Sequence, residues 1–339
     1  MSKKIRIAVT GAGGGVGQSV IKSLYDTDYE IVALDGEELG TGLYAAPRAY
    51  RIPYAKSPEF IDRIMDICQN EECKLLFPGL DAELKPFSEN RERFAAIGTT
   101  VVVSDPAVVE ISDNKLVTYD QLIPYGISVP VTLNLAQFIS KPVAVSFPLI
   151  IKQQVGGARS KNVFLLKKQA ELDDFLQRTD IRFADYVLQE YIEGDEYTCG
   201  TINLDGRCEG VIVMRRILRD GDTYKCFSVK NEVIENEVRK VMDAIKPFGA
   251  CNVQLRLRDG KPYIFEINAR CSGTTASRTL CGFNEPKMIA DYLLQGIKPV
   301  YDIKELTILR YWKELVVENE RVQLFHTAQQ MASDNFNRL

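Results

Sequence analysis

The amino-acid sequence predicts an α/β protein, in which an N-terminal parallel α/β domain is followed by an α+β region with an antiparallel sheet. Three observations predict this fold class. Over the first hundred residues, short β-rich runs alternate with amphipathic stretches of helical periodicity. Further along, strand-like runs are separated by Asp-Gly turns. The length of 339 residues is enough for two or three domains with buried cores.

The N-terminal region is expected to hold four strands and three helices. The strands are expected at residues 5–10, 30–35, 74–77 and 99–103. The helices are expected at residues 17–25, 57–68 and 81–94. Asp81 is expected to be the N-cap of the third helix, with Glu83 in its first turn. We therefore interpret Asp81 as a cap rather than a ligand.

The second region is expected to begin between residues 105 and 130, after a short helix that Ser112 would cap. It then contains a strand that ends at Lys152, strands at 162–166 and 186–190, and a helix at 169–177. Antiparallel strands are expected at residues 196–203, 208–216, 224–229, 250–258 and 263–269, with Asp-Gly turns at 205–206, 220–221 and 259–260. A strand at residues 311–317 is expected before a polar tail, interpreted as a terminal helix or a disordered segment.

Composition restricts the function. The 42 basic and 46 acidic residues give a net charge of −4, so no long-range attraction to nucleic acid or to an anionic membrane is expected. No apolar run approaches the roughly 20 residues of a bilayer span, and the eight cysteines lack paired spacing, so we expect a cytoplasmic protein with reduced thiols. The single histidine, His326, excludes catalytic triads and multi-histidine metal sites. Catalysis must use carboxylates, amides, Lys and Arg.

A glycine-rich loop follows the first expected strand. Its residues Gly11, Gly14 and Gly17 have the spacing of short-chain dehydrogenases, and Asp35 ends the next strand, where an acid could bind a ribose hydroxyl. An NAD-dependent oxidoreductase or epimerase is therefore one interpretation. However, none of the 15 tyrosines is followed four residues later by lysine, so the proton-transfer pair of those enzymes is absent. The other interpretation is a tight turn without a nucleotide.

The hairpin at residues 252–270 is the most informative part of the sequence, because its alternation predicts a register. If Val253, Leu255 and Leu257 share a face with Tyr263, Phe265 and Ile267, a two-residue Asp-Gly turn fails and a three-residue loop at 258–260 is expected. Asn252 would then lie directly opposite Glu266, with Gln254 diagonal to it.

In this register, Gln254, Glu266, Asn268 and Arg270 share the face opposite the apolar one. An exposed polar sheet surface would explain any one of them. Together, a carboxylate and two amide oxygens suit a hard cation that retains water ligands and is also coordinated by phosphate oxygens. The row therefore predicts a site for Mg²⁺, or Mn²⁺ in its place, together with the phosphates of ATP.

Several further motifs occur in a fixed order along residues 5 to 300: Asp113-Asn114-Lys115, Pro148 to Lys152 with Gly156-Gly157, Gln189 to Glu196, and Gln254 with Glu266 to Arg270. In this order they resemble the ATP-grasp enzymes, specifically one synthetase half of the carbamoyl-phosphate synthetase large chain. The resemblance implies a Rossmann-like pre-ATP-grasp domain at 1–105, a small ATP-grasp subdomain with linker helices at 106–185, and a C-terminal ATP-grasp subdomain at 186–320, before the polar tail at 321–339. A glutaminase portion, a second synthetase half and an allosteric region are missing, so this chain cannot be a complete carbamoyl-phosphate synthetase.

The resemblance also implies roles for individual residues. It implies that Lys115 and Lys152 reach the ATP phosphates and that the loop with Gly156 and Gly157 closes over them. The residues that it implies for the nucleoside are Glu190, Tyr191 and Ile192 at the adenine and Glu196 at the ribose. Those that it implies for the transferred group are Gln254, Glu266 and Asn268, which would hold the metal, and Arg270, which would neutralise the γ-phosphoryl charge. Arg159 and Lys161 are further candidates for phosphate contacts.

The expected activity is ATP-dependent ligation of a small carboxylate, such as an amino acid, to an amine or ammonia through an acyl phosphate. Candidate substrate contacts are Arg215, Arg216, Ser272, Gly273 and Thr274; because residues 215 and 216 alternate across a strand, at most one of the two arginines points inward. The alternatives are the NAD-dependent enzyme and a non-catalytic nucleotide-binding protein. The expected partners are small molecules, with no nucleic acid and no membrane, and the sequence leaves homo-oligomerisation open.

Overall fold

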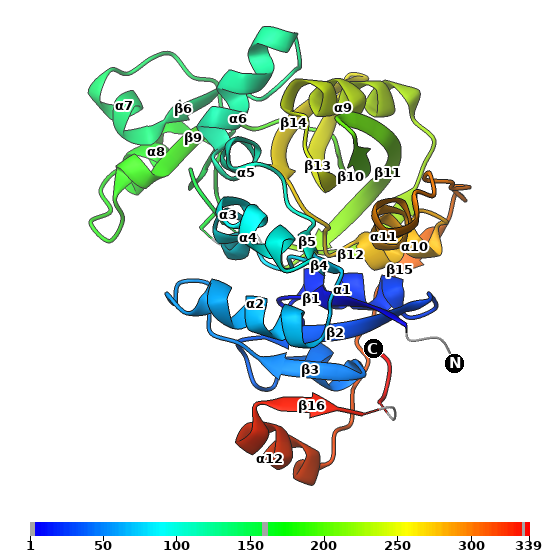
Figure 1. The fold of residues 1–339 in the computed structure, drawn as a ribbon. Coiled ribbons are helices and arrows are strands. Elements are labelled where there is room, and N and C mark those ends of the chain that lie inside the picture. Colours follow the sequence, from blue (N-terminus) through cyan, green and yellow to red (C-terminus); the bar gives the residue numbers. More distant parts are fainter. Residues whose placement is uncertain (1–3, 158–161, 334–335) are drawn as a thin grey trace.

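The computed structural model describes residues 4–157, 162–333 and 336–339, which form three sheets with their helices (Figure 1). The first sheet has the strand order β16-β3-β2-β1-β4-β5, and it is parallel except for β16. Its elements from the N-terminal region are β1 (Ile5–Val9), α1 (Gly15–Leu24), β2 (Tyr29–Asp35), η1 (Thr41–Ala45), β3 (Arg48–Arg51), α2 (Phe60–Asn70), β4 (Leu75–Phe77), α3 (Asp81–Glu89), α4 (Arg91–Ala96) and β5 (Thr100–Val101). The four expected strands are present, and β3 is an additional one.

The helix expected at residues 81–94 is broken in two at Asn90, and its expected cap is wrong. The N-cap residue is Leu80, and Asp81 is the first helical residue. Glu83 supplies the capping carboxylate instead, because its Oε2 accepts hydrogen bonds from the backbone N–H groups of Gly79 and Leu80, both at 3.2 Å. The Asp81 side chain is therefore available for another contact.

Two helices connect the N-terminal domain to a small sheet of order β6-β9-β7-β8. The elements of this part are α5 (Pro106–Asp113), α6 (Lys115–Leu122), η2 (Ile123–Tyr125), β6 (Thr132–Asn134), α7 (Leu135–Ser140), β7 (Leu149–Gln153), β8 (Phe164–Leu166), α8 (Gln169–Phe175), η3 (Phe183–Asp185) and β9 (Tyr186–Glu190). The cap expected at Ser112 is wrong, since α6 begins after Asn114, whose side chain accepts hydrogen bonds from the backbone of Leu116 and Val117.

The third sheet is antiparallel, with the order β14-β13-β10-β11-β12-β15. Its elements are β10 (Asp195–Leu204), β11 (Arg207–Arg219), β12 (Asp222–Ser228), α9 (Glu232–Ile245), β13 (Gly249–Arg258), β14 (Lys261–Asn268), α10 (Thr275–Leu280), α11 (Glu285–Gln295) and β15 (Thr307–Leu309). All three Asp-Gly pairs lie in the turns expected for them, at 205–206, 220–221 and 259–260. Both residues of each pair have positive φ, as a two-residue hairpin turn of type I′ requires.

The expected register of the β13–β14 hairpin is wrong, although Gln254 and Glu266 share a face as expected. On the apolar face, Ile264 is buried opposite Leu255 in place of the expected Tyr263 and Phe265. Near the turn, Arg258 pairs with Lys261, so the turn has two residues. A register shift after Leu255 then inserts Phe265 as an extra residue in β14, and Gln254 pairs directly with Glu266. The extra residue shifts the alternation of side chains in β14 by one position. Gln254 and Glu266 therefore lie on the same face of the hairpin despite the two-residue turn. The shift also places Phe265 on the pocket side instead of the apolar core.

The last segment of the chain packs on the N-terminal domain. The strand expected at residues 311–317 is absent; β15 at Thr307–Leu309 precedes this segment, and α12 (Asn319–Ala328) and β16 (Gln330–Ala332) follow it. Met331 pairs antiparallel with Ala49 of β3. The side chain of Phe325, in α12, is 1% exposed and packs edge-on against Tyr44. Within the described part of the tail, β16 thus forms an edge strand of the first sheet.

The N-terminal domain and the large sheet share one hydrophobic core, which runs from Ile7 and Val20 to Phe283 and Ile289. Polar contacts reinforce the junction: Ser19 Oγ of α1 donates to the Gly273 carbonyl at 2.9 Å, and Asn284 Nδ2 donates to the Ser23 carbonyl at 2.7 Å. Because side chains of both domains fill the same core, α1 is held in a fixed position beside the loop after β14.

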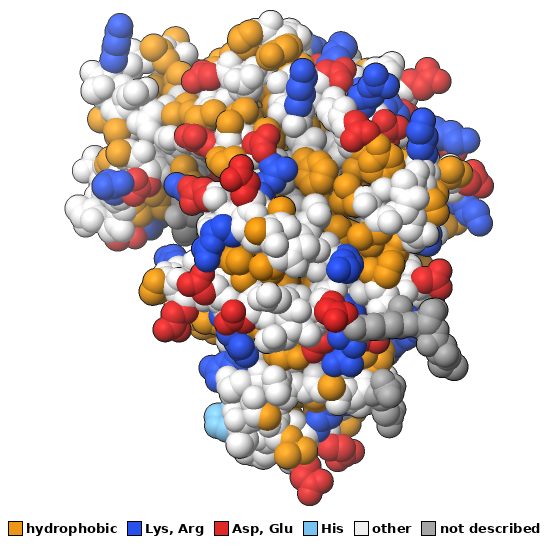
Figure 2. All heavy atoms as spheres, in the orientation of Figure 1, with side chains coloured by type: hydrophobic (Ala, Val, Ile, Leu, Met, Phe, Trp, Pro, Cys, Tyr) orange, Lys and Arg blue, Asp and Glu red, His pale blue; other side chains and the backbone are white. Residues whose placement is uncertain are grey.

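The surface carries mixed charge. Figure 2 shows Lys and Arg side chains interspersed with Asp and Glu over the face in view, in agreement with the small net charge. Among the described residues, no helix combines the length and apolar character that crossing a bilayer requires. All eight cysteines are free thiols, and Cys208 is the only one that is partly exposed.

We expect the substitution Glu83→Gln to change how stability depends on pH. Burial raises the pKa of Glu83 from 4.5 to about 7, although the hydroxyl of Thr10 donates to it. The contribution of Glu83 to stability is therefore complete below its unfolded pKa and is lost as the pH rises through about 7. Relative to the wild type, the free energy of unfolding of the variant should rise by about 2 to 3 kcal/mol between pH 5 and pH 8 in urea titrations.

Glu89→Gln on the same helix is the matched control, because the Glu89 side chain is 50% exposed and should leave the pH profile unchanged. An unfolding free energy of Glu83→Gln that runs parallel to the wild type at every pH would contradict the assignment.

Candidate functional site

A pocket with a cavity volume of about 470 Å³ lies where the three sheets meet. The small sheet lines one side of it through β7 and β9, the large sheet lines another through β10, β11, β13 and β14, and the N-terminal domain contributes the starts of α1 and α3. Among the described residues that were expected to contact ATP, the metal or the substrates, all but one line the pocket: Lys115, Lys152, Gly156, Gly157, Glu190, Tyr191, Ile192, Glu196, Arg216, Gln254, Glu266, Asn268, Arg270, Ser272, Gly273 and Thr274.

Arg215 is the exception. Its guanidinium stacks on Phe227 at 4.5 Å from the ring centroid and pairs with Asp195 at 3.7 Å. Arg216, the next residue of β11, lines the pocket. This is the alternation that a strand imposes, and it assigns the inward position to Arg216.

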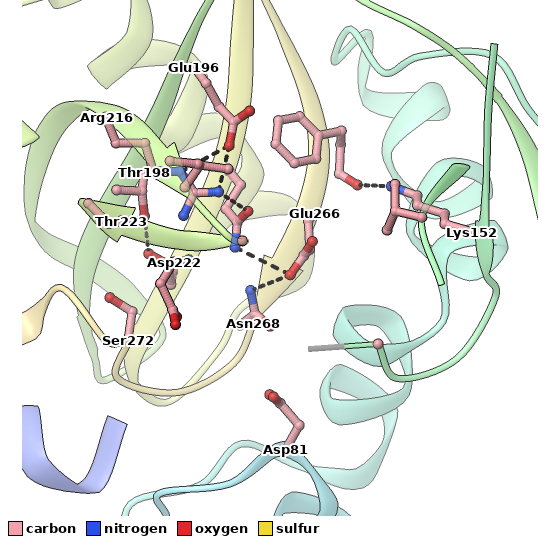
Figure 3. Close-up of a pocket in the computed structure, with 18 of the residues that line it drawn as sticks. Asp81, Lys152, Glu196, Thr198, Arg216, Asp222, Thr223, Glu266, Asn268 and Ser272 are labelled. Carbon is pink, nitrogen blue, oxygen red and sulfur yellow. Dashed lines mark hydrogen bonds and ion pairs between the residues drawn. The ribbon is translucent and has the colours of Figure 1, made fainter. Parts of the chain in front are cut away.

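Oxygen-bearing side chains of β13 and β14 meet in the middle of the pocket. Glu266 Oε1 accepts hydrogen bonds from Gln254 Nε2 at 3.2 Å and from Asn268 Nδ2 at 3.1 Å, which Figure 3 draws as dashed lines. A half-turn of the Asn268 amide exchanges its N–H group for an oxygen, so a carboxylate and an amide oxygen can face one point. The oxygen of Gln254 accepts a hydrogen bond from Arg216 at 2.6 Å, which leaves Glu266 and Asn268 as the better-placed ligands.

This donor set fits a hard divalent cation. In the part of the chain that the structure describes, no group of three or more His, Cys, Asp or Glu side chains could hold a metal alone. Mg²⁺ is usually bound by one or two protein oxygens and completes its octahedron with water and phosphate oxygens. The pair Glu266 and Asn268 matches that requirement.

Lys152 is a buried cation on the opposite wall. Only 7% of the residue is exposed, and its Nζ donates to the Phe265 carbonyl at 3.4 Å (Figure 3). Burial lowers the pKa of Lys152 to about 8, although the Glu266 carboxylate opposes this shift. Among the described residues, only the Phe265 carbonyl accepts a hydrogen bond from this ammonium, which therefore has donors to offer to an anionic ligand.

The loop after β7 is attached to the start of α6. Lys115 Nζ donates to the Gly156 carbonyl at 2.6 Å, and the backbone N–H of Gly156 donates to the Asp113 carboxylate at 2.9 Å. Gly156 and Gly157 have φ of 67° and 90°, a conformation that favours glycine. The contacts hold Lys115 and the glycines together at the pocket wall. Arg159 and Lys161 lie outside the described residues.

Glu196 is clamped by two arginines. Its Oε1 accepts a hydrogen bond from Arg216 Nη2 at 2.6 Å, and its Oε2 accepts one from Arg256 Nη2 at 2.8 Å. Arg256 also donates to the Tyr191 hydroxyl at 2.9 Å. Nearby, Glu190 is paired with Arg258 at 2.8 Å. These ion pairs fix the carboxylate of Glu196 at the end of the pocket next to β9.

An ion pair between Arg270 and Asp81 joins the large sheet to the N-terminal domain. Arg270 Nε and Nη2 donate to the two oxygens of Asp81 at 2.6 and 2.7 Å, a two-pronged contact. Although burial opposes the shift, the Arg270 charge lowers the pKa of Asp81. The residues are 189 positions apart in the sequence, and Asp81 begins a helix, where an acidic residue is common. The sequence therefore gave no signal for this contact.

The glycine-rich loop does not support the NAD interpretation. Unlike Glu196, Asp35 is buried, at 8% exposed, and lies outside the pocket lining; its oxygens accept backbone hydrogen bonds from Gly13 at 2.6 Å and from Glu37 at 2.7 Å. A Cβ atom at Gly17 would lie 2.2 Å from the Gly11 carbonyl oxygen, so this glycine is required by the tight turn itself. Gly14 and Gly15 line the pocket, which places the start of α1 beside the loop that follows β14.

Sequence reasoning missed the residues that the β11–β12 hairpin and the segment after β15 bring to the pocket. These are Leu218, Gly221, Asp222, Thr223 and Arg310. The hairpin itself was recognisable from its Asp-Gly turn, but a turn motif does not indicate which surface it covers.

Two family models match this chain. Residues 7–102 match the PylC-like N-terminal domain, and residues 182–314 match "ATP-grasp in the biosynthetic pathway with Ter operon". Residues 182–314 thus resemble an ATP-grasp family in sequence. The first match covers the parallel sheet, and the second covers the strands that carry Glu196, Glu266 and Asn268.

Individual ATP-grasp proteins match over part of their sequence. D-alanine–D-alanine ligase A from Bacillus cereus is 30% identical over 146 residues, which is 39% of this chain and 48% of that protein. The carbamoyl phosphate synthase large chain from Thermoanaerobacter sp. is 27% identical over 146 residues, which is 38% of this chain and 13% of that protein. This chain thus spans about half the length of the D-alanine–D-alanine ligases it matches.

Solved structures of ATP-grasp enzymes share the fold. The L-amino acid ligase from Bacillus licheniformis has a TM-score of 0.68 and 17% identity, covering 87% of this chain and 75% of that one. The N5-carboxyaminoimidazole synthetase from Staphylococcus aureus, complexed with ADP, has a TM-score of 0.68 and 14% identity, covering 97% and 98%. The resemblance inferred from the motifs is thus confirmed at the level of superfamily and fold.

We expect Asp81→Asn to weaken the junction between the domains. The variant leaves the Arg270 side chain, which is 11% exposed, without its carboxylate partner. The free energy of unfolding at pH 7 should fall by about 2 kcal/mol in urea titrations.

The control is Asp105→Asn, which removes an exposed ion pair with Arg91 in the same part of the chain; the side chain of Asp105 is 73% exposed. It should cost less than about 1 kcal/mol. Equal losses in the two variants would show that the Asp81–Arg270 pair does not hold the junction.

Proposed function

We propose that this ATP-grasp protein is an ATP-dependent ligase that joins a small carboxylate to an amine or ammonia. The observation that carries the proposal is the grouping, in one pocket, of the carboxylate Glu266 with three cationic side chains, Lys115, Lys152 and Arg270. A triphosphate needs several fixed cations around it, and a phosphoryl transfer needs that charge compensated as it moves. The net charge of the chain is −4, so these cations act locally.

In the proposal, ATP binds along the β7–β9 side of the pocket. Lys115, Lys152, Gly156 and Gly157 bind its phosphates, the first two through ammonium groups and the glycines through backbone N–H groups. The residues that contact the nucleoside are Glu190, Tyr191 and Ile192 at the adenine and Glu196 at the ribose hydroxyls. The clamp by Arg216 and Arg256 supports the last assignment, because it holds the Glu196 carboxylate in a single position.

Glu266 and Asn268, with Gln254 beside them, would hold Mg²⁺, or Mn²⁺ in its place. The ion would supply charge compensation for the phosphates. Arg270 faces the same place and is kept in position by Asp81, so its charge is available to the transferring group without a rearrangement.

The proposed chemistry has two steps. A carboxylate oxygen of the substrate attacks the γ-phosphorus, the bond to the β-phosphate oxygen breaks, and ADP leaves. The amine nitrogen then attacks the acyl carbon, and the C–O bond breaks with its electron pair leaving on inorganic phosphate. The protons of the amine pass to solvent. The protein supplies position and charge, and it needs no nucleophile of its own.

The names of the relatives bear on the substrate. A D-alanine–D-alanine ligase and an L-amino acid ligase are among the similar proteins, which favours an amino acid or another small carboxylate as the acid here. Ser272, Gly273 and Thr274 are proposed to contact the acid, because they follow Arg270 and line the pocket. We further propose that the protein works in the cytoplasm on small molecules, without nucleic acid or membrane; homo-oligomers are compatible with this proposal.

Trapping of the acyl phosphate tests the function. The protein is incubated with Mg·ATP, hydroxylamine and one acid at a time from a panel of amino acids and other small carboxylates. The expected result is a hydroxamate and an equal amount of ADP with at least one acid. Glu266→Gln should lower the rate about 100-fold, because it removes the charge at the metal position.

Glu209→Gln, which changes an exposed carboxylate outside the pocket, should retain the wild-type rate. Full activity of Glu266→Gln, or release of ADP that no acid stimulates, would contradict the proposed ligase.

The pH dependence of nucleotide affinity tests the role of Lys152. Its pKa of about 8 means that the ammonium loses its proton as the pH rises through this value, and the attraction to phosphate is lost with it. The Kd for ADP should therefore rise about tenfold between pH 7 and pH 9.5 in calorimetric titrations.

Lys152→Arg should bind ADP with little change over this range, since a guanidinium stays charged, and Lys152→Met should bind weakly throughout. A wild-type Kd that is constant over the range and equal to that of Lys152→Met would rule out the phosphate role.

A further inference from the structure

The side chains proposed to hold the metal, Gln254, Glu266 and Asn268, form a row that we call the metal row. Beyond the metal row, the pocket continues into a lobe that the proposed nucleotide contacts leave unused. This lobe lies between the β11–β12 hairpin, the loop after β14 and the start of α1. Its lining residues are Gly14, Gly15, Val16, Leu80, Leu218, Asp222, Thr223, Ser272 and Arg310. It combines one anionic and one cationic side chain with apolar walls from Val16, Leu80 and Leu218.

The cation of this lobe is fixed in place. Arg310 follows β15, and its backbone N–H donates to the Tyr224 carbonyl of β12 at 3.1 Å. Its Nη1 donates to the Thr223 carbonyl at 2.8 Å. Within the described ranges, neither Nε nor Nη2 donates to another residue. One edge of the guanidinium is thus anchored on β12, and its remaining N–H groups can receive a carboxylate in the two-pronged geometry that arginine favours.

The anion lies beside it on the same hairpin. Asp222 begins β12 and directly precedes Thr223, the residue that anchors Arg310. Figure 3 shows the Asp222 carboxylate directed into the pocket, on the side of Ser272 and Asn268. The backbone pairing of Arg310 with Tyr224 makes Asp222 its diagonal cross-strand neighbour, and such neighbours are roughly 7–8 Å apart at their Cα atoms. One small molecule can therefore contact both charges.

The start of α1 adds a third feature to the lobe. Gly14 and Gly15 line the pocket at the N-terminus of this ten-residue helix, where the backbone partial charge is positive. A Cβ at Gly15 would meet no atom within 4 Å, so the backbone of this turn is accessible from the lobe. The bond from Ser19 to the Gly273 carbonyl holds the helix against the loop after β14.

We infer that this lobe binds the amine substrate of the proposed ligase and that this substrate is an α-amino acid rather than ammonia. Its carboxylate pairs with Arg310 near the start of α1, and its ammonium group pairs with Asp222, which lies on the side of the metal row. In this orientation the nitrogen faces the place where the acyl phosphate forms. Ammonia would need neither the cation nor the apolar walls. The inference rests on the proposed function, and it assigns Asp222 and Arg310 to substrate recognition.

The test begins with the wild type, using the acid identified by hydroxamate formation. Each of the 20 L-amino acids, D-alanine and ammonium chloride is supplied as the amine, and amide product is measured. We expect product with an amino acid and kcat/KM at least tenfold lower with the carboxamide of that amino acid, which lacks the carboxylate. This comparison needs no variant and so does not depend on folding.

Variants then locate the contacts. Arg310→Met should abolish the discrimination between the amino acid and its carboxamide, so that the ratio of their kcat/KM values approaches one. Arg219→Met, which removes an exposed arginine of the same hairpin outside the pocket, should keep the wild-type ratio. The ratio of kcat/KM for the amino acid to kcat/KM for neutral hydroxylamine should fall at least tenfold in Asp222→Asn. The same ratio should stay unchanged in Asp220→Asn, a substitution in the turn.

The outcomes separate this inference from the proposed function. If hydroxamate forms but ammonium chloride is the only effective amine, or if Arg310→Met keeps the full discrimination, the ligase stands and the amino-acid lobe is wrong. If no acid in the panel gives hydroxamate, the ligase proposal fails and this inference fails with it.

Discussion

The extra residue in β14 is the feature on which the site depends. A two-residue turn alone would have placed Gln254 and Glu266 on opposite faces of the hairpin, because side chains alternate along a strand. By inserting Phe265, the chain keeps the tight Asp-Gly turn, buries Val253 and Ile267 on one face, and turns Gln254 and Glu266 to the other. The bulge also frees the Phe265 carbonyl, which accepts the hydrogen bond from Lys152. One inserted residue thus sets the positions of groups on two walls of the pocket.

A buried ion pair beneath the pocket is a second constraint on the positions of the pocket residues. Arg278 and Glu285 are fully buried and form an ion pair at 2.6 Å, and Arg278 also donates to Asn252 and Thr198, which line the pocket. A Cβ at position 200 would lie 2.3 Å from both charged groups, so this network requires glycine in the middle of β10. Burying two charges is costly unless they are paired, so the floor of the pocket is held by interactions that tolerate little displacement.

Local patterns predicted most of the helices and strands, although β3 was not expected and the strand expected at residues 311–317 is absent. The roles of the pocket residues came largely from the resemblance to the ATP-grasp enzymes. Alternation and turn residues identified the antiparallel strands, and the face shared by Gln254 and Glu266 followed from burial alone. The register was missed because Tyr263, Ile264 and Phe265 are consecutive apolar residues, so the sequence does not show which of them faces the core. Asp81, Asp222 and Arg310 were missed for a different reason. Each lines the pocket next to residues that are distant in the sequence, and local propensity explains each of them as a cap, a turn residue or a solvated charge.

The pairing of β16 with β3 has a consequence for how the chain is made. Met331 lies opposite Ala49, so an edge formed from residues near 50 stays open until residues near 330 have emerged from the ribosome. At a typical translation rate of about 5–20 residues per second, this gap lasts about 15 to 60 seconds. During that time β3 presents unpaired backbone groups to other nascent chains. β16 therefore pairs with the aggregation-prone edge of β3 only late in synthesis, after nearly all of the chain has been made.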